Sequence, residues 1–494
     1  MSFDLLVIGG GIQGAAVARD AALRGLRVIL LERGDLASGT SSRSSKLIHG
    51  GIRYLETGQL RLVREALRER ALLLRLAPEF VRPLPFMIPH YRGEGRSRIA
   101  VRAGLALYAA FAGHNPLAEH RMVGASEALA LEPALRPEGL LGASLYWDAQ
   151  MDDALLCVAV AIDAERAGAM VRNYTAVVSL EVAGSAWRAR FRDVDTGEEG
   201  LAEAPCVVNA AGPWAEEIRA LVRPAPGAGL RRTRGTHVVV PGQTHERALL
   251  LSARRDGRAF FVLPWGGYAL IGTTDVDDST PPGRVAPDVE DIRYLLEESA
   301  RVLPRLPASA RPLRAFAGLR SLAQGSAILP WANSREHRIL EEGTMLTLIG
   351  GKYTTHRSLA ERVVDRVARL TGARAGRCTT AEAALPGRLV AIEMLTARYP
   401  GQLRLNDSLG ITEAEVVHAV RNERARHPED ILERRSRLWL DADAMWRATA
   451  RVAAWMAPHL GWDEAARGRE AERVASALDR EAEILDAAME GARA

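Results

Sequence analysis

The hydrophobic pattern at the start of the chain predicts a strand, a helix and a second strand. Phe3–Ile8 is a short apolar run typical of a buried strand. The alanine-rich segment Ile12–Leu23 favours a helix, which Gly25 ends, and the apolar run Arg27–Leu31 follows. Two short strands joined by a helix predict the first unit of a parallel α/β sheet.

The turn between the first strand and the helix carries a nucleotide-binding pattern. Gly9, Gly11 and Gly14 have the G-x-G-x-x-G spacing, and Glu32 ends the second strand. Such glycines permit a tight turn, close approach of a pyrophosphate and close packing of helix on strand. An acidic residue at this position accepts hydrogen bonds from ribose hydroxyls and disfavours a 2′-phosphate. The pattern therefore predicts a site for FAD or NAD rather than NADP.

Two later segments repeat the order of strand, tight turn and helix start. Cys206–Ala210 runs into the turn 211–214 (AGPW), and Met345–Ile349 runs into 350–355 (GGKYTT). Because the carboxyl ends of parallel strands meet at one edge of a sheet, both turns are expected beside the same cofactor. The N-terminus of a helix that begins at 354–355 would stabilise negative charge on the cofactor ring.

Between these segments the pattern is rich in strands. Thr236–Val240, Phe260–Leu263 and Tyr268–Gly272 are apolar runs. The residues 264–267 (PWGG) between the last two favour an antiparallel hairpin.

Beyond about residue 385 the pattern is helical. Thr412 and Glu415 have the spacing of a capping box, and the segments 441–459 and 463–489 are rich in alanine, arginine and glutamate. No chemistry is evident in this part, and bracing, dimer contact and membrane contact all remain open as its role.

Composition narrows the class of protein. The 494 residues are 48% hydrophobic and 26% charged, as in soluble proteins folded over their whole length, and predict about two to four domains. The net charge of +4 is small, aromatic residues make up only 5%, and no basic stripe contains interleaved aromatic residues. These features exclude a nucleic-acid-binding protein.

Cysteine usage and the N-terminus point to a cytoplasmic protein. Cys157, Cys206 and Cys378 have no C-x-x-C spacing, so neither a disulfide framework nor a metal site is expected. No basic segment precedes the first apolar run, so no signal peptide is expected.

One segment has a pattern found at membrane surfaces. Arg92, Arg96, Arg98 and Arg102 lead into the apolar stretch Ala103–Ala112, which is shorter than the roughly 20 residues of a spanning helix. Two interpretations remain open: an amphipathic helix lying on a surface, or an ordinary buried helix.

Lysine is almost absent. Of the 65 basic residues only Lys46 and Lys352 are lysine, and both lie inside candidate motifs. An ammonium is a compact charge whose pKa can shift, which a guanidinium does not provide. We therefore predict a functional role for both.

The motifs, taken in order, resemble one family. TSSRSSKLIHGGIRYLE from Thr40, NAAGPW from Asn209, LIGTTDV from Leu270 and IGGKYTTHRSLAER from Ile349 are similar to the FAD-dependent glycerol-3-phosphate dehydrogenases, relatives of D-amino-acid oxidase. The resemblance implies an α/β fold: a Rossmann-like FAD-binding domain, an antiparallel-sheet substrate domain and a helical C-terminal domain. The expected boundaries are 1–80 with 151–215 and 340–375 for the first, 81–150 with 216–339 for the second, and 385–494 for the third.

The family implies a reaction and partners. FAD would take a hydride from C2 of sn-glycerol 3-phosphate, giving dihydroxyacetone phosphate, and the electrons would pass to a membrane quinone. A peripheral position on the inner face of the cell membrane is expected, and a homodimer remains open. Two alternatives stay: a glycerol-3-phosphate oxidase that uses oxygen, and an amine or amino-acid oxidase of the same fold.

Oxidation of a secondary alcohol phosphate requires a base for the hydroxyl proton and cations for the phosphate. His49 is the leading base candidate because the unperturbed pKa of histidine is about 6.5, although a purely structural histidine remains open. The resemblance adds Arg320 and Lys352 as catalytic residues and Arg53, Tyr54, Arg335 and Thr354 as substrate ligands.

The expected cofactor ligands come from all four motifs. They are Gly9, Gly11, Gly14, Glu32, Thr40, Ser41, Ser42, Ser45, Lys46, Leu47, Ala211, Gly212, Trp214, Gly351 and Thr355.

Overall fold

A computed structural model describes most of the chain. The described residues are 1–56, 58–113, 116–222, 229–242, 246–306, 311–323 and 337–490. Arg335, expected to bind substrate, lies outside them.

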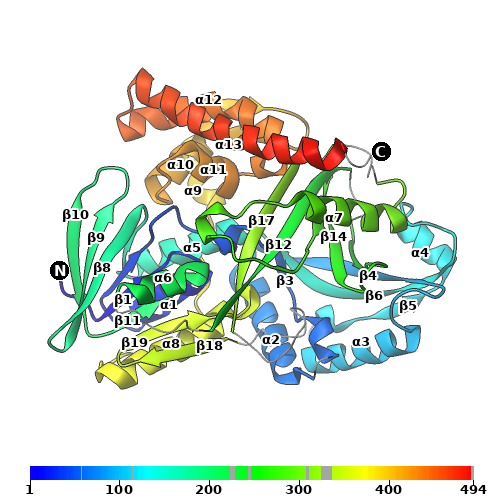
Figure 1. Ribbon diagram of the computed structural model, residues 1–494, viewed down its shortest axis with the longest axis horizontal. Helices are drawn as coiled ribbons and strands as arrows, with labels where there is room; N and C mark the ends of the chain where they lie inside the picture. Colours follow the sequence, from blue (N-terminus) through cyan, green and yellow to red (C-terminus); the bar gives the residue numbers. More distant parts are fainter. Residues whose placement is uncertain are drawn as a thin grey trace.

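A six-stranded sheet forms the nucleotide-binding part (Figure 1). Across the sheet the strands are β18 (Arg338–Glu342), β19 (Met345–Ile349), β11 (Val207–Asn209), β1 (Leu5–Ile8), β2 (Val28–Leu31) and β7 (Met170–Arg172). All neighbours are parallel except β18 and β19. The predicted strand–helix–strand unit and the strand at Met345–Ile349 are therefore confirmed.

Side-chain alternation on β1 explains the layers around this sheet. Leu5 and Val7 pack in a core with helices α1 (Ile12–Leu23), α5 (Asp153–Arg166) and α8 (His356–Thr371). Leu6 and Ile8 point to the opposite face and pack against a three-stranded sheet. That sheet consists of β8 (Thr175–Ala183), β9 (Ala186–Asp193) and β10 (Glu199–Ala204).

A second, ten-stranded sheet is mostly antiparallel. Its strands are β3 (Leu47–Ile48), β4 (Val81–Tyr91), β5 (Arg121–Val123), β6 (Leu140–Met151), β12 (Leu230–Pro241), β13 (Ala248–Ser252), β14 (Ala259–Trp265), β15 (Tyr268–Gly272), β16 (Val276–Asp277) and β17 (Arg314–Ala323). The predicted hairpin is confirmed as β14–β15, but its turn is only Gly266–Gly267, because Trp265 already pairs with Tyr268.

Helices dominate the C-terminal part. They are α9 (Leu389–Thr396), α10 (Glu413–Asn422), α11 (Pro428–Arg434), α12 (Ala442–Leu460) and α13 (Glu464–Glu490). The capping box of Thr412 and Glu415 is confirmed at the start of α10. Helix α13 packs on α12 and reaches β17 (Figure 1). There, Glu481 of α13 accepts a 2.7 Å hydrogen bond from the buried Arg314.

Helices α2 (Leu60–Leu76) and α3 (Arg98–Ala112) pack together beside the second sheet (Figure 1). Helix α3 contains the apolar stretch that had two open interpretations. It buries only Leu105 and Tyr108, so it is not an ordinary buried helix, and its contact with a membrane stays a prediction. Within the described part of the chain, no helix is both long and apolar enough to cross a membrane.

Candidate active site

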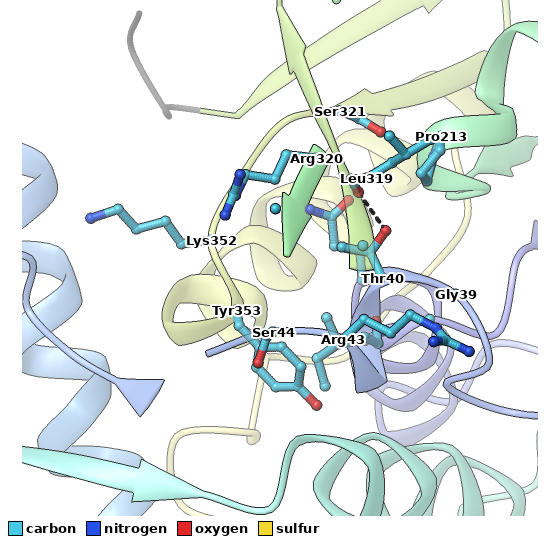
Figure 2. A pocket seen from close by; sticks show the side chains of 18 of the residues that line it. Gly39, Thr40, Arg43, Ser44, Pro213, Leu319, Arg320, Ser321, Lys352 and Tyr353 are labelled. Atoms are coloured by element: carbon cyan, nitrogen blue, oxygen red, sulfur yellow. Dashed lines mark hydrogen bonds between the residues drawn. The ribbon is translucent and has the colours of Figure 1, made fainter. Parts of the chain in front are cut away.

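A cavity of about 730 Å³ is lined by the carboxyl ends of β1, β2, β11 and β19 and by parts of β12, β14 and β17. Its volume lies within the roughly 300–1,000 Å³ usual for ligand sites. Figure 2 shows part of its wall, where Arg320 of β17 and Lys352 project from different elements.

The glycines of the first turn are required by close backbone contacts. A Cβ atom on Gly9, whose φ is +109°, would lie 2.6 Å from the carbonyl oxygen of Ala210. A Cβ on Gly14 would lie 1.9 Å from the carbonyl oxygen of Gly9. Gly9 and Gly11 line the cavity, whereas Gly14 acts in the packing of α1 behind it. Helix α1 thus starts at the cavity wall, where N-terminal N–H groups favour a phosphate.

Glu32 lines the cavity together with Gly9 and Gly11, and these residues define its expected nucleotide end. One carboxylate oxygen accepts a 2.6 Å hydrogen bond from the Gly10 N–H, and the other accepts a 2.8 Å bond from the Gly34 N–H. Burial raises the pKa of Glu32, and these backbone donors oppose that effect. The carboxylate is therefore held in a fixed orientation, and its remaining lone pairs are suited to ribose hydroxyls.

The segment from Thr40 to His49 forms the wall between the two sheets. The Thr40 hydroxyl donates a 2.6 Å hydrogen bond to the carbonyl oxygen of Leu319 (Figure 2). The expected ligands Thr40, Ser41, Ser45 and Leu47 line the cavity here, as do Ala211, Gly212, Trp214 and Gly351 on the other strands.

Lys46 is not placed for direct contact with a cofactor. Its side chain does not line the cavity, and its ammonium pairs with Asp153 and lies 4.2 Å from the centroid of the Trp439 ring. The lysine is only 3% exposed, so we correct its expected role from cofactor ligand to buried structural cation. Ser42 and Thr355 also do not line the cavity.

Arg53, Tyr54 and Lys352, which the resemblance predicts for the substrate, line the same cavity and define its expected substrate end. Arg53 and Tyr54 lie on the 3-10 helix η2 (Ile52–Leu55), and Lys352 precedes a similar turn, η7 (Tyr353–Thr355). The Lys352 ammonium lies 3.6 Å from the Tyr54 ring centroid.

Gly51 makes this contact possible. Its φ is +78°, and a Cβ there would lie 2.3 Å from Cδ2 of Tyr54 and 3.0 Å from the Lys352 ammonium nitrogen. Only glycine therefore leaves room for both side chains.

His49 lies on the same wall and is fixed by backbone contacts. The Thr354 hydroxyl lies 3.3 Å from both the N–H and the carbonyl oxygen of His49, which ties the two motifs together. The imidazole meets the ring of Phe261 edge-on, with 6.3 Å between centroids.

Arg320 is held in place by a carboxylate. Its guanidinium donates to Asp275 at 3.0 Å and to the Thr273 hydroxyl at 2.9 Å. Both partners belong to the LIGTTDV motif, for whose side chains the sequence alone predicted no role. A Cβ on Gly235 would lie 2.3 Å from this guanidinium, so that glycine makes room for it.

His237 and Arg258 also line the cavity, but the sequence patterns did not predict either residue as part of the site. Nε2 of His237 lies 2.9 Å from the Ser45 hydroxyl, and among the described residues Nδ1 has no partner. Burial, reinforced by the nearby cations Arg320 and Lys46, lowers the pKa of His237 well below its usual range, so the imidazole is neutral. His237 could have been predicted, because a histidine within an apolar strand is unusual. Arg258 could not, because no sequence pattern distinguishes it from the many other arginines.

Comparison with known proteins identifies relatives over most of the chain. A family model described as FAD dependent oxidoreductase matches residues 4–356, and one for the C-terminal domain of alpha-glycerophosphate oxidase matches residues 345–467. Glycerol-3-phosphate dehydrogenase 2 of Mycobacterium tuberculosis is 36% identical over 98% of this chain and 89% of its own. The human mitochondrial glycerol-3-phosphate dehydrogenase is 35% identical over 94% of this chain and 71% of its own.

Solved structures share the fold. The glycerol-3-phosphate dehydrogenase of Bacillus halodurans, complexed with FAD, superposes with a TM-score of 0.75 at 25% identity, covering 97% of this chain and 94% of its own. The L-alpha-glycerophosphate oxidase of Mycoplasma pneumoniae, with FAD bound, gives 0.61 at 19% identity, covering 76% and 96%.

Proposed function

Since the chain belongs to the FAD-dependent glycerol-3-phosphate dehydrogenases, within the FAD dependent oxidoreductase family, we propose that it oxidises sn-glycerol 3-phosphate to dihydroxyacetone phosphate and passes the electrons to a membrane quinone. One observation carries the proposal: the residues expected to bind and oxidise the substrate line the same cavity as the glycine turn and Glu32. These residues are His49, Arg53, Tyr54, Arg320 and Lys352. We further propose the three-part domain division given above.

The described residues fit FAD. The backbone of Gly9 and Gly11 leaves space for a pyrophosphate at the start of α1, and Glu32 offers a carboxylate to the ribose. When bound, FAD accepts the hydride that leaves C2 of the substrate.

The protein would bind and orient the substrate through its cations. Arg53 and Lys352 are placed at one end of the cavity and would bind the phosphate dianion, for which charge-assisted hydrogen bonds are strongest. Arg320, fixed by Asp275, would donate to the C2 oxygen and stabilise negative charge as the hydroxyl proton leaves.

His49 would accept that proton. Its backbone is tied to Thr354, which holds the backbone of His49 close to the turn that carries Lys352. Neutral His237 is a poor base because its pKa is so low, and we propose that it supports the wall through Ser45 instead.

A second cavity supports an apolar electron acceptor. It has a volume of about 160 Å³ and shares Ile52, Arg53, Leu250 and Ala259 with the large cavity. Its wall is mainly apolar, which suits a quinone ring better than a polar acceptor. We propose peripheral attachment to the inner face of the cell membrane, where such an acceptor resides.

The test is anaerobic mixing of the FAD-loaded protein with glycerol 3-phosphate, followed by flavin absorbance. Bleaching with glycerol 3-phosphate but not with glycine or D-amino acids is expected; the reverse would favour an amino-acid oxidase. Re-oxidation by a soluble quinone analogue without peroxide release is then expected, and rapid peroxide formation in air would instead identify an oxidase.

A further inference from the structure

A buried polar cluster contacts the turn that follows His49. Its three side chains come from separate elements: Arg70 from α2, Tyr108 from α3 and Asp148 from β6. Each of these residues is at most 4% exposed. They meet at Gly50, whose N–H nitrogen lies 2.8 Å from the Tyr108 hydroxyl oxygen and 3.2 Å from a carboxylate oxygen of Asp148. The backbone next to His49 is therefore bonded to the cluster.

Hydrogen bonds join the three side chains of the cluster to one another. The Tyr108 hydroxyl donates to the Asp148 carboxylate and lies 2.8 and 2.9 Å from its two oxygens. The Arg70 guanidinium donates to the same carboxylate at 2.5 Å and to the carbonyl oxygen of Trp147 at 2.9 Å. The groups that hold the N–H of Gly50 are thus themselves held in fixed orientations.

The turn fits closely against the cluster. A Cβ on Gly50 would lie 2.4 Å from the Tyr108 hydroxyl oxygen and 2.6 Å from Cδ2 of Leu67. From a separate segment of the chain, the Thr354 hydroxyl lies 3.3 Å from both the N–H and the carbonyl oxygen of His49. Contacts from different elements therefore fix the backbone on which the imidazole of His49 is placed.

Packing alone does not require an ion pair at this position. Removing two charges from water is unfavourable, and apolar side chains can often replace a buried ion pair without loss of stability. Burial raises the pKa of Asp148, although Arg70 and Tyr108 oppose this effect. Within the described part of the chain, Nε and Nη2 of Arg70 have no hydrogen-bond partner. Because Asp148 also lines the large cavity, a role in the site explains this arrangement better than packing does.

We propose that Tyr108, Asp148 and Arg70 position His49 for proton transfer from the substrate. They act through the backbone of Gly50 and not as acids or bases. The proposal rests on the proposed function, in which the imidazole of His49 accepts the proton of the C2 hydroxyl. A shift of the turn would move the imidazole relative to that hydroxyl, and a misplacement of about 1 Å can lower a rate by about a hundredfold.

The first test is Tyr108→Phe, which removes the hydroxyl and keeps the ring. In the full-length, FAD-loaded protein, the limiting rate of anaerobic flavin bleaching by glycerol 3-phosphate should fall by about tenfold. The half-saturating concentration of glycerol 3-phosphate should change by less than about twofold, because Arg53 and Lys352, proposed to bind the phosphate, are unaltered. A limiting rate equal to that of the wild type would contradict the positioning role.

A double-mutant cycle with His49→Ala separates positioning from a general loss of rigidity. His49→Ala should itself lower the limiting rate by about a hundredfold or more. In that background Tyr108→Phe should change the rate by less than about twofold, because the group that Tyr108 positions is absent. A further tenfold loss in the His49→Ala background would overturn the proposal.

Tyr174→Phe is the matched control. The Tyr174 hydroxyl donates to the buried Asp430 at 2.5 Å, and Tyr174 does not line the large cavity. This variant should lower the melting temperature and leave the limiting rate unchanged, and a rate loss equal to that of Tyr108→Phe would overturn the proposal. Asp148→Asn, which keeps the shape of the side chain and removes its charge, is a second variant for the same cycle and should show the same dependence on His49.

The outcomes distinguish the positioning role from the proposed function. If glycerol 3-phosphate bleaches the wild-type flavin and both Tyr108→Phe and Asp148→Asn are equally fast, the positioning role alone is wrong. If glycerol 3-phosphate does not bleach the wild-type flavin, the proposed function is wrong and the positioning role falls with it. A rate loss that is present with His49 and absent without it supports both.

Discussion

A Lys352→Met substitution removes one ammonium group from the part of the cavity that is proposed to bind the substrate, and it keeps an unbranched stem of similar length. That ammonium lies 3.6 Å from the Tyr54 ring centroid and lines the cavity with Arg53. Loss of a charge-assisted hydrogen bond to the phosphate costs about 1.5–3 kcal/mol, which corresponds to a factor of about 10 to 150 in substrate affinity. FAD content should not change, because the residues proposed to bind its nucleotide, Gly9, Gly11 and Glu32, are unaltered.

The assay is stopped-flow bleaching of the flavin under anaerobic conditions across a range of glycerol 3-phosphate concentrations. The half-saturating concentration should rise by the stated factor. With glycerol, which lacks the phosphate, wild type and variant should be equally slow. Half-saturation within threefold of the wild-type value would refute the assignment of Lys352 to the phosphate.

The other lysine provides a matched control. Lys46→Met leaves the Asp153 carboxylate buried without its cation, a change that typically costs about 3–5 kcal/mol. Thermal unfolding should therefore start at a lower temperature, whereas half-saturation by substrate should stay near the wild-type value. If Lys46→Met reproduces the kinetic defect of Lys352→Met, the distinction between the two lysines is wrong.

Two further predictions concern the C-terminal part. Asp35 accepts hydrogen bonds from Arg434 at 2.7 Å and from Arg435 at 2.6 Å, and it lies three residues beyond Glu32. Asp35→Asn should therefore lower the melting temperature and speed the release of FAD, measured by flavin fluorescence. An unchanged rate of FAD release would contradict this coupling. Burial acts to raise the pKa of Glu423, but basic neighbours led by Arg388 outweigh it and hold the pKa at about 2. Because the folded-state pKa lies below the ordinary value of about 4.3, this stabilisation is complete above that value and is lost as pH falls towards 2. Glu423→Gln should therefore flatten the melting temperature between about pH 4.3 and 2, and an unchanged acid dependence would contradict it.

Sequence patterns predicted the nucleotide end well because its constraints are local. Gly9 and Gly14 are required by contacts within a single strand–helix turn and the strand beside it, so their spacing is visible in the chain. The boundaries of α1 and β19 followed from apolar runs bounded by glycine in the same way.

Contacts between distant segments were harder to predict. Lys46 was expected to bind the cofactor, but its partner Asp153 lies 107 positions later, and no local pattern indicates which way a side chain turns. Asp275 and His237 join the site only because β12, β15 and β17 pair side by side, a register that the sequence alone does not specify.

Strand β17 gives the last helix an influence on chemistry that it does not touch. Among the described residues, none from α13 lines the large cavity. Yet Glu481 of α13 accepts a hydrogen bond from Arg314, the first residue of β17, and Arg320 lies six residues later on the same strand. In shortened forms that lack α13, the guanidinium of Arg314 would become exposed and that of Arg320, further along β17, would be misaligned. Inactivity of such forms would then report faulty alignment of β17, and would be weak evidence for a reactive group in the removed segment.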